Sequence, residues 1–252
     1  MKTSPGYSRR AVLAAGTAWA LCGCASHSTS PVENSDSTPS ATSSTVVPSS
    51  PPATPSSSPS AHIDRSAPES LGVLVNKHHP MNPQNWAPAD LVNFSGVQLR
   101  AEAAEAASKL FAAASETGLA LKALSGFRSF ETQQQTYQHW VSTQGQEHAD
   151  VASARPGYSE HQTGLAMDIG TGSGCDLQVC FAQTPEAQWL AENAYRFGFI
   201  LRFPYWQHEV TGYWFESWHY RYLGVDEAHR YRDSTAKSLE EFWGADSAPN
   251  YL

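Results

Sequence analysis

The residues best suited to chemistry are two histidines and two acidic residues in two short stretches of the chain. His161 and Asp168 lie seven residues apart, and Glu216 lies three residues before His219. Two imidazoles and one carboxylate are ligands that a catalytic zinc ion takes in proteins, with a fourth position left open for water. A nearby carboxylate can act as the base for that water. These residue types predict a zinc site of His161, Asp168 and His219, with Glu216 as the catalytic base.

The sequence around these residues indicates how they are positioned. Gly164 predicts a turn between the first two ligands, and Leu165–Ile169 then has the pattern of a short strand. The aromatic segment Tyr213–Tyr222, which carries the other histidine, also has the pattern of a strand. Spacing alone leaves a surface or core role open for each residue, because a His, an Asp and a second His are easily found by chance.

The length of the motif narrows the choice. Ser-x-His-x-x-Gly-x-Ala-x-Asp followed by Glu-x-Trp-His closely resembles the zinc D-alanyl-D-alanine carboxypeptidases of the VanY type, a family of bacterial cell-wall peptidases. The segment Ser125–Ser129, with Gln133 after it, and the segment Leu74–Lys77 also fit that family. The matching residues of the two main motifs are Ser159, His161, Gly164, Ala166, Asp168, Glu216, Trp218 and His219.

The resemblance implies a role for each matched position. It makes His161, Asp168 and His219 the zinc ligands, and Glu216 the general base. It implies that Arg128 steadies the oxyanion that forms when the peptide carbonyl becomes tetrahedral.

The resemblance also implies a substrate pocket. Ser159 is expected beside the terminal carboxylate of the substrate, and Gln133 is expected to line the same pocket. Tyr158 could form a wall of the pocket, but a tyrosine packed in the core would leave the same sequence pattern.

The activity implied by the resemblance is removal of the terminal D-Ala from peptidoglycan stem peptides. An L,D-carboxypeptidase acting on tetrapeptide stems is the alternative, since such relatives share these residues. A non-catalytic wall-binding module is a second alternative, but it should lack a ligand or the base. The segment Ser234–Lys237 matches the Ser-x-x-Lys motif of serine peptidases, yet the partner motifs of those enzymes are missing from the sequence.

Composition and length limit the architecture. The chain of 252 residues can form one sizeable domain, and its net charge of −8 argues against nucleic acid as a partner. Helical and strand-like patterns both occur, which allows an α+β fold. The resemblance supplies the rest: a small, mostly antiparallel sheet carrying the zinc site, flanked by helices, as in hedgehog and DD-peptidase-like domains. A monomer is expected.

The N-terminal part predicts export. Residues 1–24 have basic residues followed by a short apolar run, as in a signal peptide, and end in Leu21-Cys-Gly-Cys24, which resembles a lipobox. Cys24 would carry lipid and hold the protein on the outer face of the membrane. The Sec and twin-arginine routes both remain open. Residues 25–68 are rich in Ser, Pro and Thr and predict a disordered tether, so the catalytic domain is expected over 69–252.

Two further cysteines predict a crosslink. Cys175 and Cys180 are expected to form a disulfide in an exported protein; zinc-binding thiols are the weaker alternative.

The periodicity of apolar residues predicts the remaining elements. The predicted strands are 71–76, 119–124 and 199–203. The predicted helices are 97–115, 131–141, one starting at 184 and one over 233–243, and 145–158 is predicted to be a loop.

Overall fold

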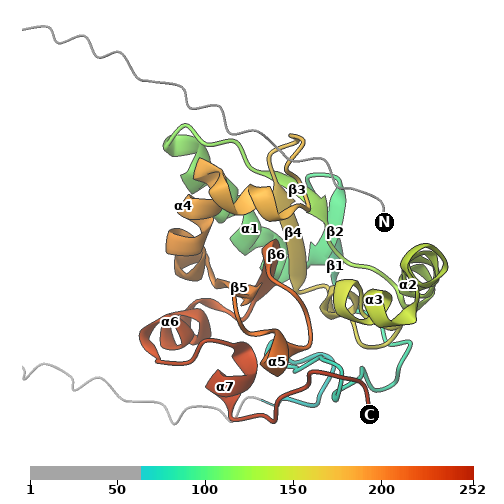
Figure 1. Cartoon of the computed structure of the whole chain (residues 1–252). Helices are drawn as coiled ribbons and strands as arrows, with labels where there is room; N and C mark the ends of the chain where they lie inside the picture. Colours follow the sequence, from blue (N-terminus) through green and yellow to red (C-terminus); the bar gives the residue numbers. More distant parts are fainter. Residues whose placement is uncertain (1–63) are drawn as a thin grey trace, which may run out of the picture. The chain divides into compact units, whose positions relative to one another are not determined.

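A four-stranded sheet forms the centre of the domain in the computed structural model, which describes residues 64–252. Every neighbouring pair of strands in it is antiparallel, and the spatial order is β3-β4-β6-β5 (Figure 1). The strands are β3 (Lys122–Ser125), β4 (Ala166–Gly170), β5 (Phe199–Phe203) and β6 (Glu216–Tyr222). All five residues of β4 are buried, as expected for a central strand covered on both faces.

A hairpin and a long helix pack beside this sheet. Strands β1 (Leu91–Phe94) and β2 (Val97–Arg100) are joined by Ser95 and Gly96, which both have positive φ. Helix α1 (Ala101–Glu116) follows β2 directly. Its buried face consists mostly of alanines and includes a fully buried leucine, so the helix lies close to its neighbours in the core.

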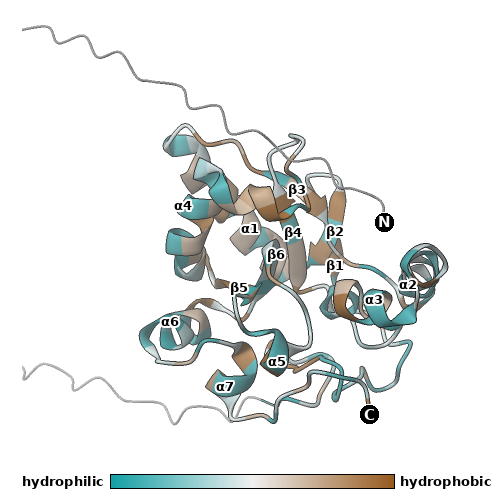
Figure 2. Cartoon of the chain, in the orientation of Figure 1, coloured by the Kyte–Doolittle hydropathy of each residue, from teal (hydrophilic) through white to brown (hydrophobic). Residues whose placement is uncertain are grey.

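The remaining helices surround the sheet. In the view of Figure 1, α2 and α3 lie on one side of the sheet, and α4 and α6 lie on the other. Figure 2 shows that α2 and α6 are largely hydrophilic, as expected for helices that face solvent. The helices are α2 (Phe130–Gln144), α3 (Gln146–Ala152), α4 (Pro185–Asn193), α5 (His208–Thr211), α6 (Val225–Asp233) and α7 (Leu239–Trp243), with 3-10 turns at η1 (Glu160–Thr163), η2 (Val179–Gln183) and η3 (Ala194–Phe197).

Several predicted elements are confirmed. The structure has the expected α+β architecture, and β5 spans the predicted residues 199–203. Helix α4 begins where it was expected, with the side chain of Thr184 capping its first turn and Pro185 at the first helical position. The Cys175–Cys180 disulfide is present, so these sulfurs are not zinc-binding thiols.

Other predictions were wrong. The predicted helix over 97–115 begins as strand β2, because Val97 and Leu99 pair with the preceding hairpin strand. The predicted loop over 145–158 contains helix α3. The predicted closing helix over 233–243 is replaced by α6 and α7, with a break between Asp233 and Leu239.

The segment 71–76 is buried but is not a strand. The main-chain oxygens of Leu71 and Val73 accept hydrogen bonds from the side chain of Arg221, at 2.9 and 2.8 Å. The main-chain N–H of Leu74 donates to the main-chain oxygen of Arg65. A buried side chain therefore satisfies the backbone groups that a neighbouring strand would otherwise pair.

Packing begins slightly before the predicted domain boundary at residue 69. The side chain of Arg65 donates to Glu227 at 3.3 Å and lies over the ring of Trp243. The predicted signal peptide, Cys24 and most of the predicted tether lie outside the described residues. Among residues 64–252, no helix has the length and apolar character needed to cross a membrane.

Candidate zinc centre and active site

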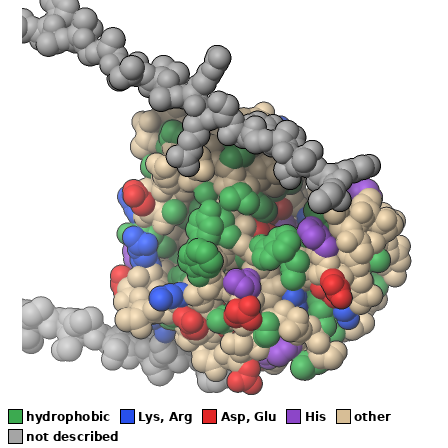
Figure 3. All heavy atoms as spheres, in the orientation of Figure 1, with side chains coloured by type: hydrophobic (Ala, Val, Ile, Leu, Met, Phe, Trp, Pro, Cys, Tyr) green, Lys and Arg blue, Asp and Glu red, His purple; other side chains and the backbone are tan. Residues whose placement is uncertain are grey.

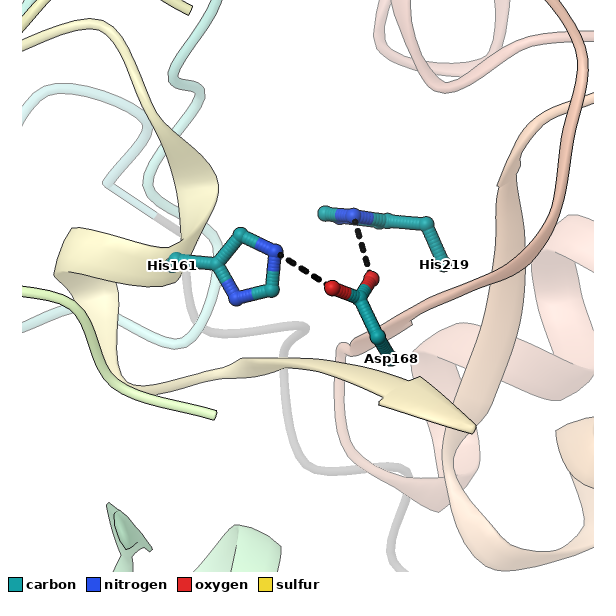
Figure 4. Close-up of side chains that lie close together, drawn as sticks. All are labelled: His161, Asp168 and His219. Carbon is teal, nitrogen blue, oxygen red and sulfur yellow. Dashed lines mark ion pairs between the residues drawn. The ribbon is translucent and has the colours of Figure 1, made fainter. Parts of the chain in front are cut away.

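The three predicted ligands come together beside the two central strands of the sheet. His161 lies in η1, Asp168 on β4 and His219 on β6 (Figure 4). Gly164, with φ of 67°, turns the chain from η1 into β4, and Asp168 is directly opposite His219 in the β4–β6 register. The register of the sheet therefore places a carboxylate and an imidazole side by side, and the turn supplies the other imidazole.

The ligand atoms converge closely enough for one metal ion. One nitrogen from each histidine and an oxygen of Asp168 all lie within 4.8 Å of one another. Nε2 of His161 and Nδ1 of His219 each lie 3.3 Å from an Asp168 oxygen. Asp168 Oδ1 is buried without a hydrogen-bond partner among residues 64–252. Buried oxygens are normally satisfied, so this orphaned atom fits a zinc ligand.

The outer nitrogen of His161 is also engaged. Its Nδ1 lies 2.8 Å from the main-chain oxygen of Gly126. A carbonyl can only accept, so the proton sits on Nδ1 and the lone pair of Nε2 faces Asp168. This arrangement is the one that metal-binding histidines usually adopt.

Burial shapes the charges of the site. Burial opposes ionisation of Asp168, but the two neighbouring imidazoles hold its pKa far below the usual range. Burial lowers the pKa of His161. Burial also opposes charging of His219, yet its contacts with Asp168 and Glu160 raise its pKa to about 9. Metal binding requires neutral imidazoles, so zinc must displace a proton from His219.

Glu216 lies beside the ligands without joining them. It is the first residue of β6, and its Oε2 lies 3.7 Å from His219 Nδ1. Burial raises its pKa to about 7. A carboxylate with a pKa near neutrality is suited to take and return a proton, which agrees with its predicted role as base.

Arg128 reaches the same cavity and is held in place by two side chains. It donates to the Gln133 side-chain oxygen at 2.8 Å and to the Ser125 hydroxyl at 3.1 Å. Burial lowers its pKa, while the charges of Asp168 and Glu216 oppose that change. The guanidinium therefore remains a cation next to the proposed metal and base.

Gln133 has a different place from the one predicted. Its side chain is fully buried, and it does not line the cavity. Besides accepting from Arg128, its amide donates to the main-chain oxygen of Ala154 at 2.6 Å and to the Ser153 hydroxyl at 3.2 Å. Gln133 thus orients Arg128 instead of contacting substrate, because all its hydrogen bonds are made inside the protein.

A cavity of about 480 Å³ opens over the site. Tyr158 and Ser159 both line it. Figure 3 shows hydrophobic side chains gathered at the centre of the face in view. Besides the ligands, base and Arg128, the lining includes Trp140, His148, Leu177, Gln178, Val179, Phe203, Tyr213, Trp214, Phe215 and Trp218.

The part of the cavity wall formed by Trp140 and His148 was missed in the sequence. The rings of Trp140 and His148 stack at 6.1 Å, and His148 meets Trp214 edge to face at 5.1 Å. Two of these residues lie on α2 and α3, and the latter helix was not predicted. The disulfide-closed segment 175–180 adds Leu177 and Val179 to the lining.

The C-terminal residues Pro249 and Tyr251 contact residues that line or adjoin the cavity, and this role was also missed in the sequence. The buried Lys77 donates to the main-chain oxygen of Pro249 at 2.9 Å and lies 4.9 Å from the ring centre of Tyr213. The hydroxyl of Tyr251 lies 3.2 Å from that of Tyr213 and accepts from the main-chain N–H of Arg155. The only sequence signal was the match of Leu74–Lys77 to the family.

Comparison with known proteins gives a consistent result. The family model described as VanY, D-alanyl-D-alanine carboxypeptidase, matches residues 96–225. A putative carboxypeptidase, YodJ, from Bacillus subtilis is 41% identical over 187 residues, which cover 70% of this chain and 68% of that protein. A D-alanyl-D-alanine carboxypeptidase from Enterococcus faecalis is 33% identical, and the match covers 62% of this chain and 59% of the relative.

Solved structures agree with these matches. The LdcB LD-carboxypeptidase has a TM-score of 0.65 and 38% identity, covering 71% of this chain and 88% of the other. A mutant of the vancomycin resistance D,D-pentapeptidase VanY, solved in complex with Zn(II), has a TM-score of 0.60 and 34% identity, covering 69% and 99%. The converging ligands, the adjacent base and these similarities together show that the chain belongs to the VanY D-alanyl-D-alanine carboxypeptidase family.

Proposed function

We propose that this protein is a zinc-dependent D-alanyl-D-alanine carboxypeptidase that removes the terminal D-Ala from peptidoglycan stem peptides. The observation that carries the proposal is the convergence of His161, Asp168 and His219 within 4.8 Å, with the Glu216 carboxylate beside them. The relatives named D-alanyl-D-alanine carboxypeptidases support the substrate class.

The residues of the site divide the work. His161, Asp168 and His219 would hold the zinc ion, which lowers the pKa of water and polarises a carbonyl. Glu216 accepts a proton from the attacking water and delivers it to the amine of the departing D-Ala. Arg128 stabilises the negative charge that develops on the oxygen of the cleaved peptide group.

Recognition of the chain end falls to the cavity lining. Ser159 is buried and borders the cavity next to the ligand-bearing turn η1. Its hydroxyl is suited to donate to the terminal carboxylate of the substrate. Tyr158 borders the same cavity and packs edge to face against Tyr251, at 5.1 Å between ring centres, so it forms a firm wall.

The decisive test is mass spectrometry of purified muropeptides after incubation with the chain from residue 25 onward. Pentapeptide and tetrapeptide stems are supplied separately, with and without a chelator and with zinc restored. Chelator-sensitive conversion of pentapeptide to tetrapeptide is expected. Conversion of tetrapeptide to tripeptide alone would instead assign L,D-carboxypeptidase activity, the activity for which the LdcB relative is named. Bound zinc without any cleavage would indicate a binding module.

We further propose that the protein acts as a monomer at the outer face of the membrane, held by lipid on Cys24. The motif Leu21-Cys-Gly-Cys24 supports this location. Labelling cells with a fatty-acid analogue is expected to label the wild type and a Cys22→Ala variant but not a Cys24→Ala variant. Equal labelling of both variants would reject Cys24 as the anchor, and size-exclusion chromatography with light scattering tests the monomer.

A further inference from the structure

Glu160 connects a predicted zinc ligand to a buried group of charged residues. It is the first residue of η1, next to His161 in the chain, and its side chain is 2% exposed. Its Oε2 lies 3.3 Å from Nε2 of His219. Its Oε1 accepts from Arg202 at 2.8 Å and from Arg221 at 3.0 Å. One carboxylate therefore joins the zinc site to two buried arginines.

The charges of this group balance. Arg202 donates two hydrogen bonds to the buried Glu240, at 2.9 and 2.6 Å. With Glu160 and Arg221, the group holds two acids and two guanidinium cations. One oxygen of Glu160 accepts hydrogen bonds from both guanidinium groups, at 2.8 and 3.0 Å. Glu160 is therefore a carboxylate, which can only accept hydrogen bonds.

The two nitrogens of His219 face different partners. Nδ1 points toward Asp168 and Glu216, at 3.3 and 3.7 Å, whereas Nε2 points toward Glu160. Since Glu160 can only accept, Nε2 keeps its proton. The proton that zinc must displace is then the one on Nδ1, and its loss leaves the lone pair on Nδ1. His161 has the opposite assignment, because its Nδ1 faces the Gly126 carbonyl.

We propose that Glu160 is a positioning residue that sets the tautomer and the ring orientation of His219, so that Nδ1 presents its lone pair beside Asp168. The inference rests on the proposed function, because zinc is the ion that this lone pair would bind. Arg202 and Arg221 hold the carboxylate from the side away from the metal. The same three-part arrangement of carboxylate, histidine and zinc raises the basicity of the ligand and fixes its direction.

The variant Glu160→Gln is expected to bind zinc more weakly than the wild type. An amide has one accepting oxygen, and the two arginines would draw it toward themselves. The amide NH₂ would then face His219 Nε2 as a donor and favour the tautomer with its proton on Nδ1. Removal of such a partner weakens metal binding by roughly 10- to 100-fold, and a loss of that size is expected here.

The test measures zinc affinity instead of peptide cleavage. Zinc dissociation constants are determined by competition with a chromophoric chelator for the full chain from residue 25 onward. The matched control is Glu240→Gln, which removes the same charge from the same buried group without touching His219. Glu240→Gln is expected to bind zinc within about threefold of the wild type, whereas Glu160→Gln loses affinity as stated.

Two double variants, each with the charge of the buried group kept balanced, separate a loss of zinc affinity from a loss of folding. Glu160→Gln and Glu240→Gln are each combined with Arg221→Met, so that each protein loses one acid and one cation. Melting of the metal-free proteins checks that both are folded, and only the first double variant should bind zinc weakly. Equal affinities within the pair would overturn the role of Glu160. A wild type without zinc affinity would instead reject the proposed function.

Discussion

Replacing Glu216 with glutamine is expected to change turnover and stability in opposite directions. The side chain is 17% exposed, lies 3.7 Å from His219 Nδ1, and is not among the converging ligand atoms. Glutamine keeps the size of the side chain but cannot accept the proton of the attacking water. Zinc binding should therefore survive in Glu216→Gln while the catalytic step slows.

The loss of rate follows from the role of the base. General base catalysis contributes about 10²- to 10⁴-fold, which corresponds to roughly 3–5 kcal/mol of activation free energy. The loss should appear in kcat, because the substituted group does not contact the terminal carboxylate of the substrate in the proposed mechanism. In the wild type, kcat should fall as pH drops through the pKa of Glu216, which burial raises to about 7 in the absence of zinc. Bound zinc would move this limit to lower pH.

The gain in stability follows from the same pKa. The carboxyl of Glu216 has a pKa of about 7 in the folded protein, against 4.5 for a glutamate exposed to water. Between these values the folded state binds more protons, so the free energy of unfolding of the metal-free protein falls as pH rises. At pH 8 the buried charge costs about 3 kcal/mol, and at pH 5 it costs under about 1 kcal/mol. Glu216→Gln removes this cost.

Two measurements check both halves of this prediction. Urea unfolding of chelator-treated protein at pH 8 and pH 5 should show Glu216→Gln more stable than the wild type at pH 8, with the difference mostly gone at pH 5. Steady-state cleavage of a pentapeptide stem with zinc present should show the loss in kcat. Glu192→Gln, at an exposed position on α4, is the matched control and should change neither quantity. Wild-type turnover, or identical stability at both pH values, would refute the reasoning about Glu216.

Three further predictions follow from other parts of the structure. The lysine of Arg128→Lys cannot keep the contacts with both Gln133 and Ser125. Steady-state kinetics should therefore show kcat/KM reduced by about 10²- to 10³-fold. Unchanged zinc affinity in a titration would exclude a damaged metal site. Burial lowers the pKa of Lys77 to about 8. Above that pH the unfolded state binds more protons than the folded state, so the free energy of unfolding should rise with pH. Urea unfolding should show this rise from pH 8 to 9.5 in the wild type but not in Lys77→Met. Replacing Cys175 and Cys180 with serine removes the disulfide and should lower the free energy of unfolding, measured in urea, by about 2 kcal/mol. The same change should raise KM, because the loop that the disulfide closes borders the cavity. An unchanged KM would show that the loop is not part of the binding site.

The metal ligands could be predicted because their motif is long and resembles that of a known family, although the three residue types alone are easily found by chance. The turn at Gly164 and the strand after it also follow from local sequence, since the left-handed conformation observed there favours glycine. Strand β5 and the start of α4 were predictable for the same reason: β-branched and aromatic residues favour the strand, and a threonine followed by proline favours the helix start.

The predictions failed where tertiary contacts override local pattern. The alanine-rich stretch favours a helix from Val97 onward, yet pairing with Leu91–Phe94 draws its first four residues into β2. The apolar run 71–76 has the composition of a strand, but the side chain of Arg221 donates hydrogen bonds to two of its main-chain oxygens. Arg221 lies far from 71–76 in the sequence, so no local window reveals it. The hairpin partner of β2 lies directly before it and was overlooked in favour of the alanine-rich pattern.

Glu160, proposed to orient His219, could not be found in the sequence because contacts with distant segments decide its environment. Glu160 occupies a position that the metal motif leaves unspecified, and an acidic residue there predicts an exposed side chain. Its burial depends on Arg202 and Arg221, which lie on the neighbouring strands β5 and β6, and on Glu240 at the start of α7. These residues meet only because the sheet register brings β5 beside β6. Since uncompensated burial of any one charge would be costly, the buried position of Glu160 depends on charged residues outside the metal motif, of which Arg202 contacts it directly and Glu240 through Arg202.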